Sequence, residues 1–317
     1  MKYIFEKVSE LKGKSLLSML DLNKDQINTI INLSYLFKEL YYLGIKEVNY
    51  LKNKKIGLIF QKPSTRTRVS FTVAIQELGG VPYYFGWSEL QLIRGETVKD
   101  TAKVLSKYLD GAILRVYEHE ILNEFADNFG KPIINALSDL EHPCQILADF
   151  YTIYEKFGKL DNITVAYIGD GANNIANSLL LGCATMGINI NIVAPKKYQP
   201  LYEILNKSYE IAKKNNCKIN VTENIEEGVK NADIIYTDVF VSMGMEKEKE
   251  ERLSLLKPYQ VNQRVMEIAK NAYFMHCGPW HLGEEVTPEV VYGERSLVFE
   301  QAENRLHVSK AILISLF

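Results

Sequence analysis

Short apolar runs alternate with longer amphipathic segments along most of the chain. The apolar runs predict β-strands at residues 54–60, 81–85, 111–116, 132–136, 163–169, 190–194, 218–221, 233–239 and 273–277. Between them, segments such as 25–40 and 98–109 carry apolar side chains at helical spacing. This alternation is typical of parallel sheets, so we predict an α/β protein with two similar-sized domains, each a parallel sheet flanked by helices.

The sequence also indicates where the domains meet. The stretch "GKLDN", residues 158–162, separates a helical segment from a new strand and is the best local boundary signal. We assign residues 1–145 to a first domain, residues 146–300 to a second, and residues 301–317 to a C-terminal helix that closes on the first. Ligands of such folds bind at the carboxyl ends of the strands, so functional residues are expected there.

Composition narrows the class of protein. The net charge of −2 argues against a nucleic-acid partner, and no apolar run approaches the roughly 18 residues of a membrane helix. The charged N-terminal segment lacks the apolar core of a secretion signal, and the four cysteines are far apart, so we expect a cytoplasmic protein. The charged run at residues 245–254 is interpreted as a solvated helix or loop.

One polar stretch, "KPSTRTRVSF" at residues 62–71, lies where a predicted strand turns into a helix. A helix start carries unpaired N–H groups and partial positive charge, which favour anions. Hydroxyl and guanidinium groups gather there on Ser64, Thr65, Arg66, Thr67 and Arg68. Guanidinium groups suit phosphate oxygens. The stretch therefore predicts a phosphate site, although it is not a Walker A loop, because no GxxxxGK[ST] is present.

Further polar residues follow other predicted strands. Arg115 ends the strand-like run at 111–116, and His142 and Gln145 lie three residues apart on one helix face. A histidine can donate to a carbonyl oxygen that gains negative charge, and a glutamine offers both an acceptor and a donor. Asp238 precedes Ser242 by four residues, which suits the ammonium and the carboxylate of an α-amino acid.

Two weaker patterns point to a cofactor or a metal. "GDGANNIANS", residues 169–178, begins like a dinucleotide fingerprint, but Asn174 occupies the position of the third glycine. His142 and Cys144 could form half of a metal site, but no matching second pair is evident. Cys144 is therefore interpreted as a small buried residue, and neither a metal nor an organic cofactor is expected.

The motifs together resemble the aspartate/ornithine carbamoyltransferase family. The matching stretches are "FQKPSTRTRVSF", "RGETVKDTAKVLSKYLDG", "RVYEH", "NALSDLEHPCQILAD", "DVFVSMG", "HCGP" and "FEQAENRLHVSKA". They cover nearly the whole chain in the order of the family, and "SMG" indicates the ornithine branch. The resemblance implies transfer of a carbamoyl group from carbamoyl phosphate to L-ornithine, giving L-citrulline and phosphate, in arginine metabolism. It implies that the first domain binds carbamoyl phosphate and the second binds ornithine.

The resemblance also assigns residues. It implies that carbamoyl phosphate is bound by Ser64, Thr65, Arg66, Thr67, Gln91, Arg115, His142, Gln145, Cys277, Gly278 and Arg305. Arg115, His142 and Cys277 are the expected catalytic residues. Ornithine is expected to contact Asn174, Asp238, Ser242 and Met243, with Asn173 as the alternative to Asn174. In the family the residue matching Gln91 reaches a neighbouring subunit, which implies a homotrimer or an assembly of trimers.

One motif departs from the family. The usual "HCLP" is "HCGP" here, so Gly278 replaces leucine, and Trp280 and Leu282 replace residues that are often small or basic. These changes leave open a carbamoyltransferase that acts on putrescine, lysine or a modified ornithine. Two rival classes are a nicotinamide-dependent oxidoreductase, through "GDGANN", and a non-catalytic protein of the same fold. The intact "STRT", "HPCQ" and "ENR" motifs oppose the last.

Overall fold

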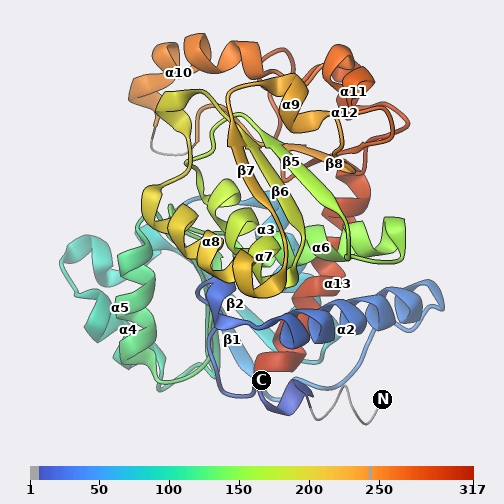
Figure 1. Cartoon of the computed structure of the whole chain (residues 1–317). Coiled ribbons are helices and arrows are strands. Elements are labelled where there is room, and N and C mark those ends of the chain that lie inside the picture. Colours follow the sequence, from blue (N-terminus) through green and yellow to red (C-terminus); the bar gives the residue numbers. More distant parts are fainter. Residues whose placement is uncertain (1–6, 243–244) are drawn as a thin grey trace. The chain divides into compact units, whose positions relative to one another are not determined.

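The computed structural model describes residues 7–242 and 245–317 (Figure 1). The chain divides into two compact units. The first unit comprises Met1–Glu155 with Glu303–Phe317, and the second unit comprises Lys156–Ala302. Helix α6 (Pro143–Phe157) runs through the division at Glu155 as well as through the boundary predicted after residue 145. In the described part of the chain, no helix combines the length and the apolar character needed to cross a lipid bilayer.

The first unit contains a four-stranded parallel sheet in the order β2-β1-β3-β4. The strands are β1 (Lys55–Phe60), β2 (Val81–Gly86), β3 (Gly111–Arg115) and β4 (Ile133–Leu137). The longer helices are α2 (Lys24–Tyr42), α3 (Thr65–Glu77), α4 (Val98–Leu105), α5 (His119–Phe129), α6 and most of α13 (Val298–Leu316). Short 3₁₀ turns are η1 (Met19–Asp21), η2 (Trp87–Glu89) and η3 (Gln91–Arg94). All of β1 after Lys55 is buried, as expected for a central parallel strand.

The second unit contains a five-stranded parallel sheet in the order β7-β6-β5-β8-β9. Its strands are β5 (Thr164–Ile168), β6 (Asn189–Val193), β7 (Ile219–Thr222), β8 (Ile234–Thr237) and β9 (Tyr273–His276). Its helices are α7 (Asn174–Met186), α8 (Tyr202–Asn215), α9 (Ile225–Val229), α10 (Lys249–Leu256), α11 (Gln263–Ile268) and α12 (Pro288–Val291). Short 3₁₀ turns are η4 (Lys196–Tyr198), η5 (Glu246–Glu248) and η6 (Lys257–Tyr259). The predicted pair of parallel sheets flanked by helices is confirmed.

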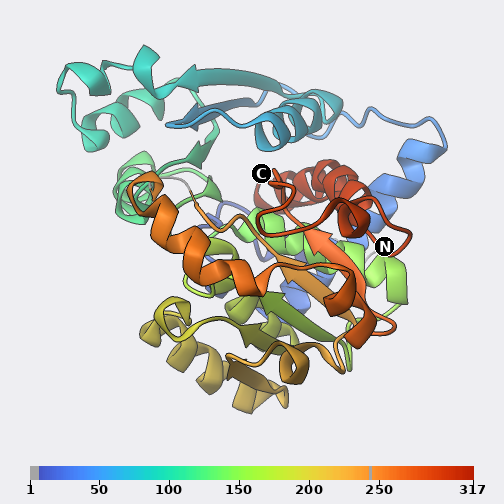
Figure 2. The ribbon, with the colours of Figure 1, turned by 90° about the horizontal axis from the view of Figure 1, so that it is seen from above.

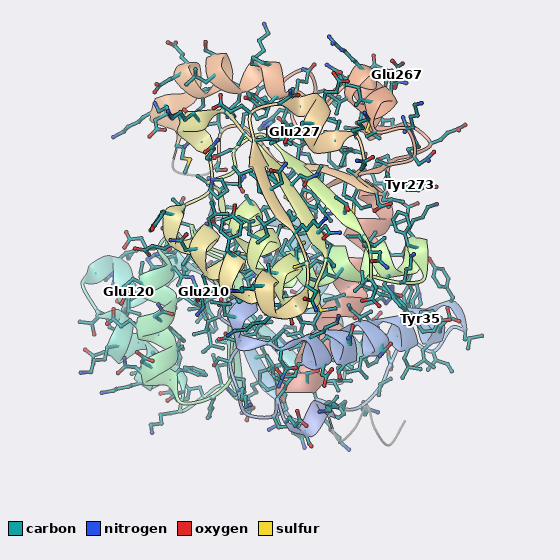
Figure 3. All side chains as sticks on the ribbon, viewed as in Figure 1. Tyr35, Glu120, Glu210, Glu227, Glu267 and Tyr273 are labelled. Atoms are coloured by element: carbon teal, nitrogen blue, oxygen red, sulfur yellow. The ribbon has the colours of Figure 1, made fainter. Side chains whose placement is uncertain are left out.

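Helices α2 and α5 bury one face and expose the other, whereas residues 143–153 of α6 and 175–186 of α7 are buried throughout. Tyr35 on α2 and Glu120 on α5 both lie on solvent-exposed positions (Figure 3). The C-terminal part of α13 packs within the first unit, where it lies beside α6 (Figures 1 and 2), and Asn304 Nδ2 donates to Thr152 Oγ1 over 3.0 Å. This contact joins the first-unit part of α13 to α6.

Strand order determines where ligands can bind in each unit. In the first sheet the chain passes from β1 to β2 and then returns to the other side of β1 as β3. In the second sheet it passes from β5 through β6 to β7 and returns beside β5 as β8. Ligands of open α/β sheets bind beyond the carboxyl ends of the two strands at such a reversal. The ends of β1 and β3, and those of β5 and β8, are therefore the places to look.

Candidate active site

The first reversal point carries the stretch that the sequence singled out. Phe60 at the end of β1 lies opposite Arg115 at the end of β3. Helix α3 begins at Thr65, five residues after Phe60. Ser64 is the N-cap residue of α3, yet its side chain makes no capping hydrogen bond, and the first turn carries no acidic residue. The helix start thus keeps hydroxyl and N–H donors for an anion.

A buried hydrogen-bonded chain connects this helix with α6 and α13. Arg305 donates through Nη2 to Thr67 Oγ1 over 3.2 Å and through Nη1 to Gln145 Oε1. Gln145 in turn donates through Nε2 to Asp149 Oδ1 over 2.8 Å. All four side chains are buried, with exposures of 3% or less. The structure therefore brings Thr67, Gln145 and Arg305 together, as the resemblance implied, and adds Asp149, which the sequence analysis did not single out.

His142 lies among positive charges. Its side chain is buried, and its pKa is well below the ordinary value, chiefly because of burial and further because of the charges of Arg305, Arg115 and Arg66. The imidazole is therefore neutral near pH 7 and can offer an N–H to a carbonyl oxygen. Arg66, Arg115 and Arg305, whose charges act on His142, are called the cationic cluster below.

Three other residues of the sequence motifs, Arg68, Gln91 and Cys144, lie outside the hydrogen-bonded chain described above. Arg68 is exposed and stacks on the ring of Tyr84, with its guanidinium carbon 3.5 Å from the ring centroid. Gln91 is exposed on η3 and takes no part in the hydrogen-bonded chain described above. Cys144 is buried, its thiol donates to the Asn135 carbonyl over 3.3 Å, and burial raises the pKa of that thiol to about 12. These properties fit a structural cysteine.

Buried neutral histidines make the protein sensitive to acid. Burial lowers the pKa of His307 to about 4, with Lys38 and Lys310 acting in the same direction and Glu303 opposing them. The unfolded chain therefore binds more protons than the folded chain between about pH 6.5 and pH 4. We expect the free energy of unfolding to fall by about 1–3 kcal/mol from this residue as the pH drops through that range.

Urea unfolding at pH 7 and at pH 5 tests this expectation. His307→Gln cannot be protonated, so the variant should lose less stability than the wild type over the same pH interval. An equal loss in the two proteins would contradict the assignment.

The second reversal point carries a carboxylate. Asp238 follows β8, is 6% exposed, and receives hydrogen bonds from the Cys277 thiol (3.1 Å) and from Asn173 Nδ2 (3.4 Å). Burial raises the pKa of Asp238, while the charge of His276 and the Cys277 hydrogen bond oppose that shift. A bound ammonium group would offset the cost of keeping this carboxylate ionised.

The two candidate asparagines differ in burial and in their position on α7. Asn173 is buried as the N-cap of α7: its Oδ1 accepts from Ala176 N over 2.8 Å, and its Nδ2 donates to the Tyr167 hydroxyl over 2.8 Å. Asn174 is the first residue of α7 and is half-buried. Asn174 is the more accessible of the two and stays the predicted ligand contact.

The loop after Asp238 is described only in part. Ser242 is half-buried, and its buried Oγ has no hydrogen-bond partner among the described residues. Met243 lies outside the described residues.

The charged run at residues 245–254 is largely exposed, but Arg252 on α10 is buried and donates to Asp170 Oδ2 over 2.7 Å. The interpretation of this run as a solvated helix or loop thus holds for most of it but not for Arg252, whose partner lies 82 positions earlier in the chain.

The "HCGP" turn is held by a buried pair. Gly278 N donates to His276 Nδ1 over 2.8 Å, and His276 Nε2 lies 3.4 Å from Glu285 Oε1, with both side chains fully buried. Gly278 has a φ of +66°, a region that favours glycine. The Trp280 ring packs edge-on against His276 and Phe299 at centroid distances of 6.1 and 5.9 Å. Trp280 therefore packs against the protein's own aromatic rings.

Among the residues that the structure describes, two groups of side chains have the composition of a metal site. Asp238, His276 and Cys277 form one, and His281, Glu284 and Glu285 form the other, with ligand atoms within 4.8 Å of one another in each group. The first coincides with the carboxylate site above. The expectation that no metal is required stays a prediction.

The first unit thus presents hydroxyl groups and guanidinium groups at its strand ends, and the second unit presents a buried carboxylate at its own. Residues 14–155 match the family model described as "Aspartate/ornithine carbamoyltransferase, carbamoyl-P binding domain", and residues 161–316 match the model of its "Asp/Orn binding domain". The chain belongs to the aspartate/ornithine carbamoyltransferase family and is a carbamoyltransferase. The resemblance stated from the motifs is confirmed.

Relatives and solved structures agree with this assignment. The ornithine carbamoyltransferase of Archaeoglobus fulgidus is 50% identical over 96% of this chain and 97% of its own length. That of Hyperthermus butylicus is 51% identical with the same coverage. The structure of ornithine carbamoyltransferase from Pyrococcus furiosus superposes with a TM-score of 0.91 at 43% identity and covers 96% of this chain and 97% of that chain. These relatives do not favour a carbamoyltransferase that acts on putrescine, lysine or a modified ornithine. They do not favour a nicotinamide-dependent oxidoreductase either.

Proposed function

We propose that the protein transfers the carbamoyl group of carbamoyl phosphate to the side-chain amine of L-ornithine and releases L-citrulline and phosphate. The observation that carries this proposal is the buried contact of Arg305 with Thr67 and Gln145 beside the start of α3, next to a His142 on which the charges of the cationic cluster act. Cations stabilise the phosphate, and the imidazole N–H stabilises the carbonyl oxygen as it gains charge. The match to a carbamoyl-P binding domain and the names of the relatives support the same substrates.

The residues of the first unit have distinct proposed tasks. The phosphate is held by Ser64, Thr65, Arg66, Thr67 and Arg305. Arg115 and His142 polarise the carbonyl group, and Gln145 accepts a hydrogen bond from the carbamoyl NH₂ group. The work is positioning and electrostatic stabilisation, with no covalent acyl-enzyme and no metal or organic cofactor.

The residues of the second unit hold the amino acid. Asp238 binds the α-ammonium group, and Asn174 and Ser242 bind the α-carboxylate together with the loop at Met243. Cys277 lies next to the reacting amine, and the Gly278 carbonyl helps to orient the carbamoyl NH₂ group. The neutral amine attacks the carbonyl carbon, the bond from that carbon to the phosphate oxygen breaks, and the amine loses a proton.

Two observations favour ornithine over the other amines. Putrescine has no carboxylate and would leave the donor groups near Ser242 without a partner. Trp280, which suggested a changed substrate, packs against His276 and Phe299. We therefore propose that the departure from "HCLP" is a tolerated variation.

The reaction is expected to accelerate with pH, because only a neutral amine can attack. An alkyl ammonium group has a pKa of about 10.4, so roughly 1 in 2,000 molecules is neutral near pH 7. The kcat/KM for ornithine, measured as citrulline formed, should rise about tenfold per pH unit from pH 6 to 9. A profile that is flat over this range would contradict direct attack as the limiting step, and the absence of citrulline at every pH would overturn the proposed function.

Assembly and location belong to the same proposal. We infer a homotrimer or an assembly of trimers, in which the exposed Gln91 contributes to the site of a neighbouring subunit. We further propose a cytoplasmic enzyme of arginine biosynthesis. Size measurement in solution tests the assembly.

A further inference from the structure

The amide of Gln145 lies between a cation and a carboxylate inside the first unit. Its Oε1 accepts from Arg305 Nη1, and its Nε2 donates to Asp149 Oδ1 over 2.8 Å. Gln145 is 2% exposed, Arg305 is 3% exposed and Asp149 is fully buried. Gln145 and Asp149 are four residues apart on α6, so they share one face of that helix.

These two neighbours determine which way the amide points. A guanidinium group has only donors and an ionised carboxylate has only acceptors. The reversed amide would place N–H against guanidinium and carbonyl oxygen against carboxylate, and both contacts would be repulsive. Asp149 therefore secures the Nε2 end, and the Oε1 end is held on the side of Arg305, whose other nitrogen contacts Thr67 of the phosphate-binding helix.

The orientation has a chemical consequence. An amide oxygen has two acceptor positions, and Arg305 uses one of them. The other can accept from an NH₂ group on the phosphorylated compound that Thr67 and Arg305 contact. A carbamoyl group carries such an NH₂ group, whereas an acetyl group of nearly the same shape carries a methyl group.

We propose that Asp149 is a specificity-determining positioning residue, which orients the Gln145 amide so that the site selects carbamoyl phosphate over acyl phosphates without an NH₂ group. This inference rests on the proposed function. Asp149 acts through Gln145 and is not itself a catalytic residue.

The test compares the binding of three ligands by isothermal titration calorimetry: carbamoyl phosphate, acetyl phosphate and inorganic phosphate. The selectivity is the Kd for acetyl phosphate divided by the Kd for carbamoyl phosphate. Asp149→Leu removes the acceptor at similar volume, and it should reduce the selectivity about tenfold, which corresponds to one hydrogen bond. The Kd for inorganic phosphate should change by less than about threefold, because phosphate contacts do not depend on the amide orientation.

Two further variants sharpen the comparison. Asp149→Asn keeps an oxygen that accepts from Nε2, so its selectivity should stay within about threefold of the wild type. Gln145→Leu removes the amide altogether and should lose selectivity to the same degree as Asp149→Leu. Should Asp149→Leu not fold, Asp149→Ser gives the same comparison, because its hydroxyl is too short to reach Nε2.

The outcomes separate the inference from the proposed function. Wild-type selectivity retained in Asp149→Leu, or lost equally in Asp149→Asn, would overturn the positioning role alone. A wild-type protein that binds inorganic phosphate but does not prefer carbamoyl phosphate to acetyl phosphate would also overturn it. A wild-type protein that does not bind carbamoyl phosphate would overturn the proposed function and this inference with it.

Discussion

Replacing Arg66 by alanine is expected to weaken the binding of carbamoyl phosphate at least about a hundredfold while the fold stays intact. Arg66 belongs to the cationic cluster that lowers the pKa of His142, and it follows the N-cap of α3 by two positions. A hydrogen bond to a charged group contributes about 1.5–3 kcal/mol, and a guanidinium group can supply two to a phosphate. Calorimetric titration with carbamoyl phosphate measures the change, and circular dichroism checks the fold.

Arg68→Ala is the matched control for this prediction. Arg68 lies in the same motif, two positions later, but it is exposed and stacks on Tyr84. Its removal should change the Kd for carbamoyl phosphate by less than about threefold, as expected for a surface residue away from the ligand. Unchanged binding in Arg66→Ala, or an equal loss in both variants, would contradict the placement of the phosphate.

Asp238→Asn is expected to lower the kcat/KM for ornithine by about 10² to 10³. The amide has nearly the same shape as the carboxylate but lacks the charge that an ammonium group needs. Removing one partner of a buried charge pair costs about 2–5 kcal/mol, which corresponds to this loss. Steady-state kinetics with ornithine as the varied substrate measure the effect.

The control is Asp233→Asn, at the other end of the same strand. Asp233 accepts a hydrogen bond from Thr164 N over 2.8 Å, and an asparagine oxygen can accept the same bond. We expect kinetic constants close to those of the wild type. The Kd for carbamoyl phosphate should stay unchanged in both variants, and a loss of that binding in Asp238→Asn would contradict the separate roles of the two units.

The sheets could be predicted from the sequence because each central strand is buried on both faces. Residues 56–60 of β1 and 165–168 of β5 are continuously buried, and they read as unbroken apolar runs. The end of each run marks where a polar ligand site can begin. Strand order was not predictable in this way, because it depends on which apolar runs pair over long sequence separations. The order in turn determines that ligands bind at the ends of β1 and β3 and at the ends of β5 and β8.

Individual site residues were predictable only where they belong to a recognisable sequence motif. Arg66 and Arg68 look equivalent in the sequence, but residues two apart on a helix face different directions, so only the structure separates them. Asp149, Arg252 and Glu285 were not identified. Their hydrogen-bond networks join residues that are far apart in the sequence. The Arg305–Gln145 contact spans 160 positions, and the Arg252–Asp170 contact spans 82.

The most direct test of the account is a competition for one carbamoyl donor. Purified protein is mixed with carbamoyl phosphate and equal concentrations of L-ornithine, putrescine, L-lysine and L-aspartate, and each ureido product is quantified together with released phosphate. The account predicts citrulline as the dominant product, formed in equal amount with phosphate, and its loss in Arg66→Ala. A different dominant ureido product, or no product while carbamoyl phosphate still binds, would contradict it.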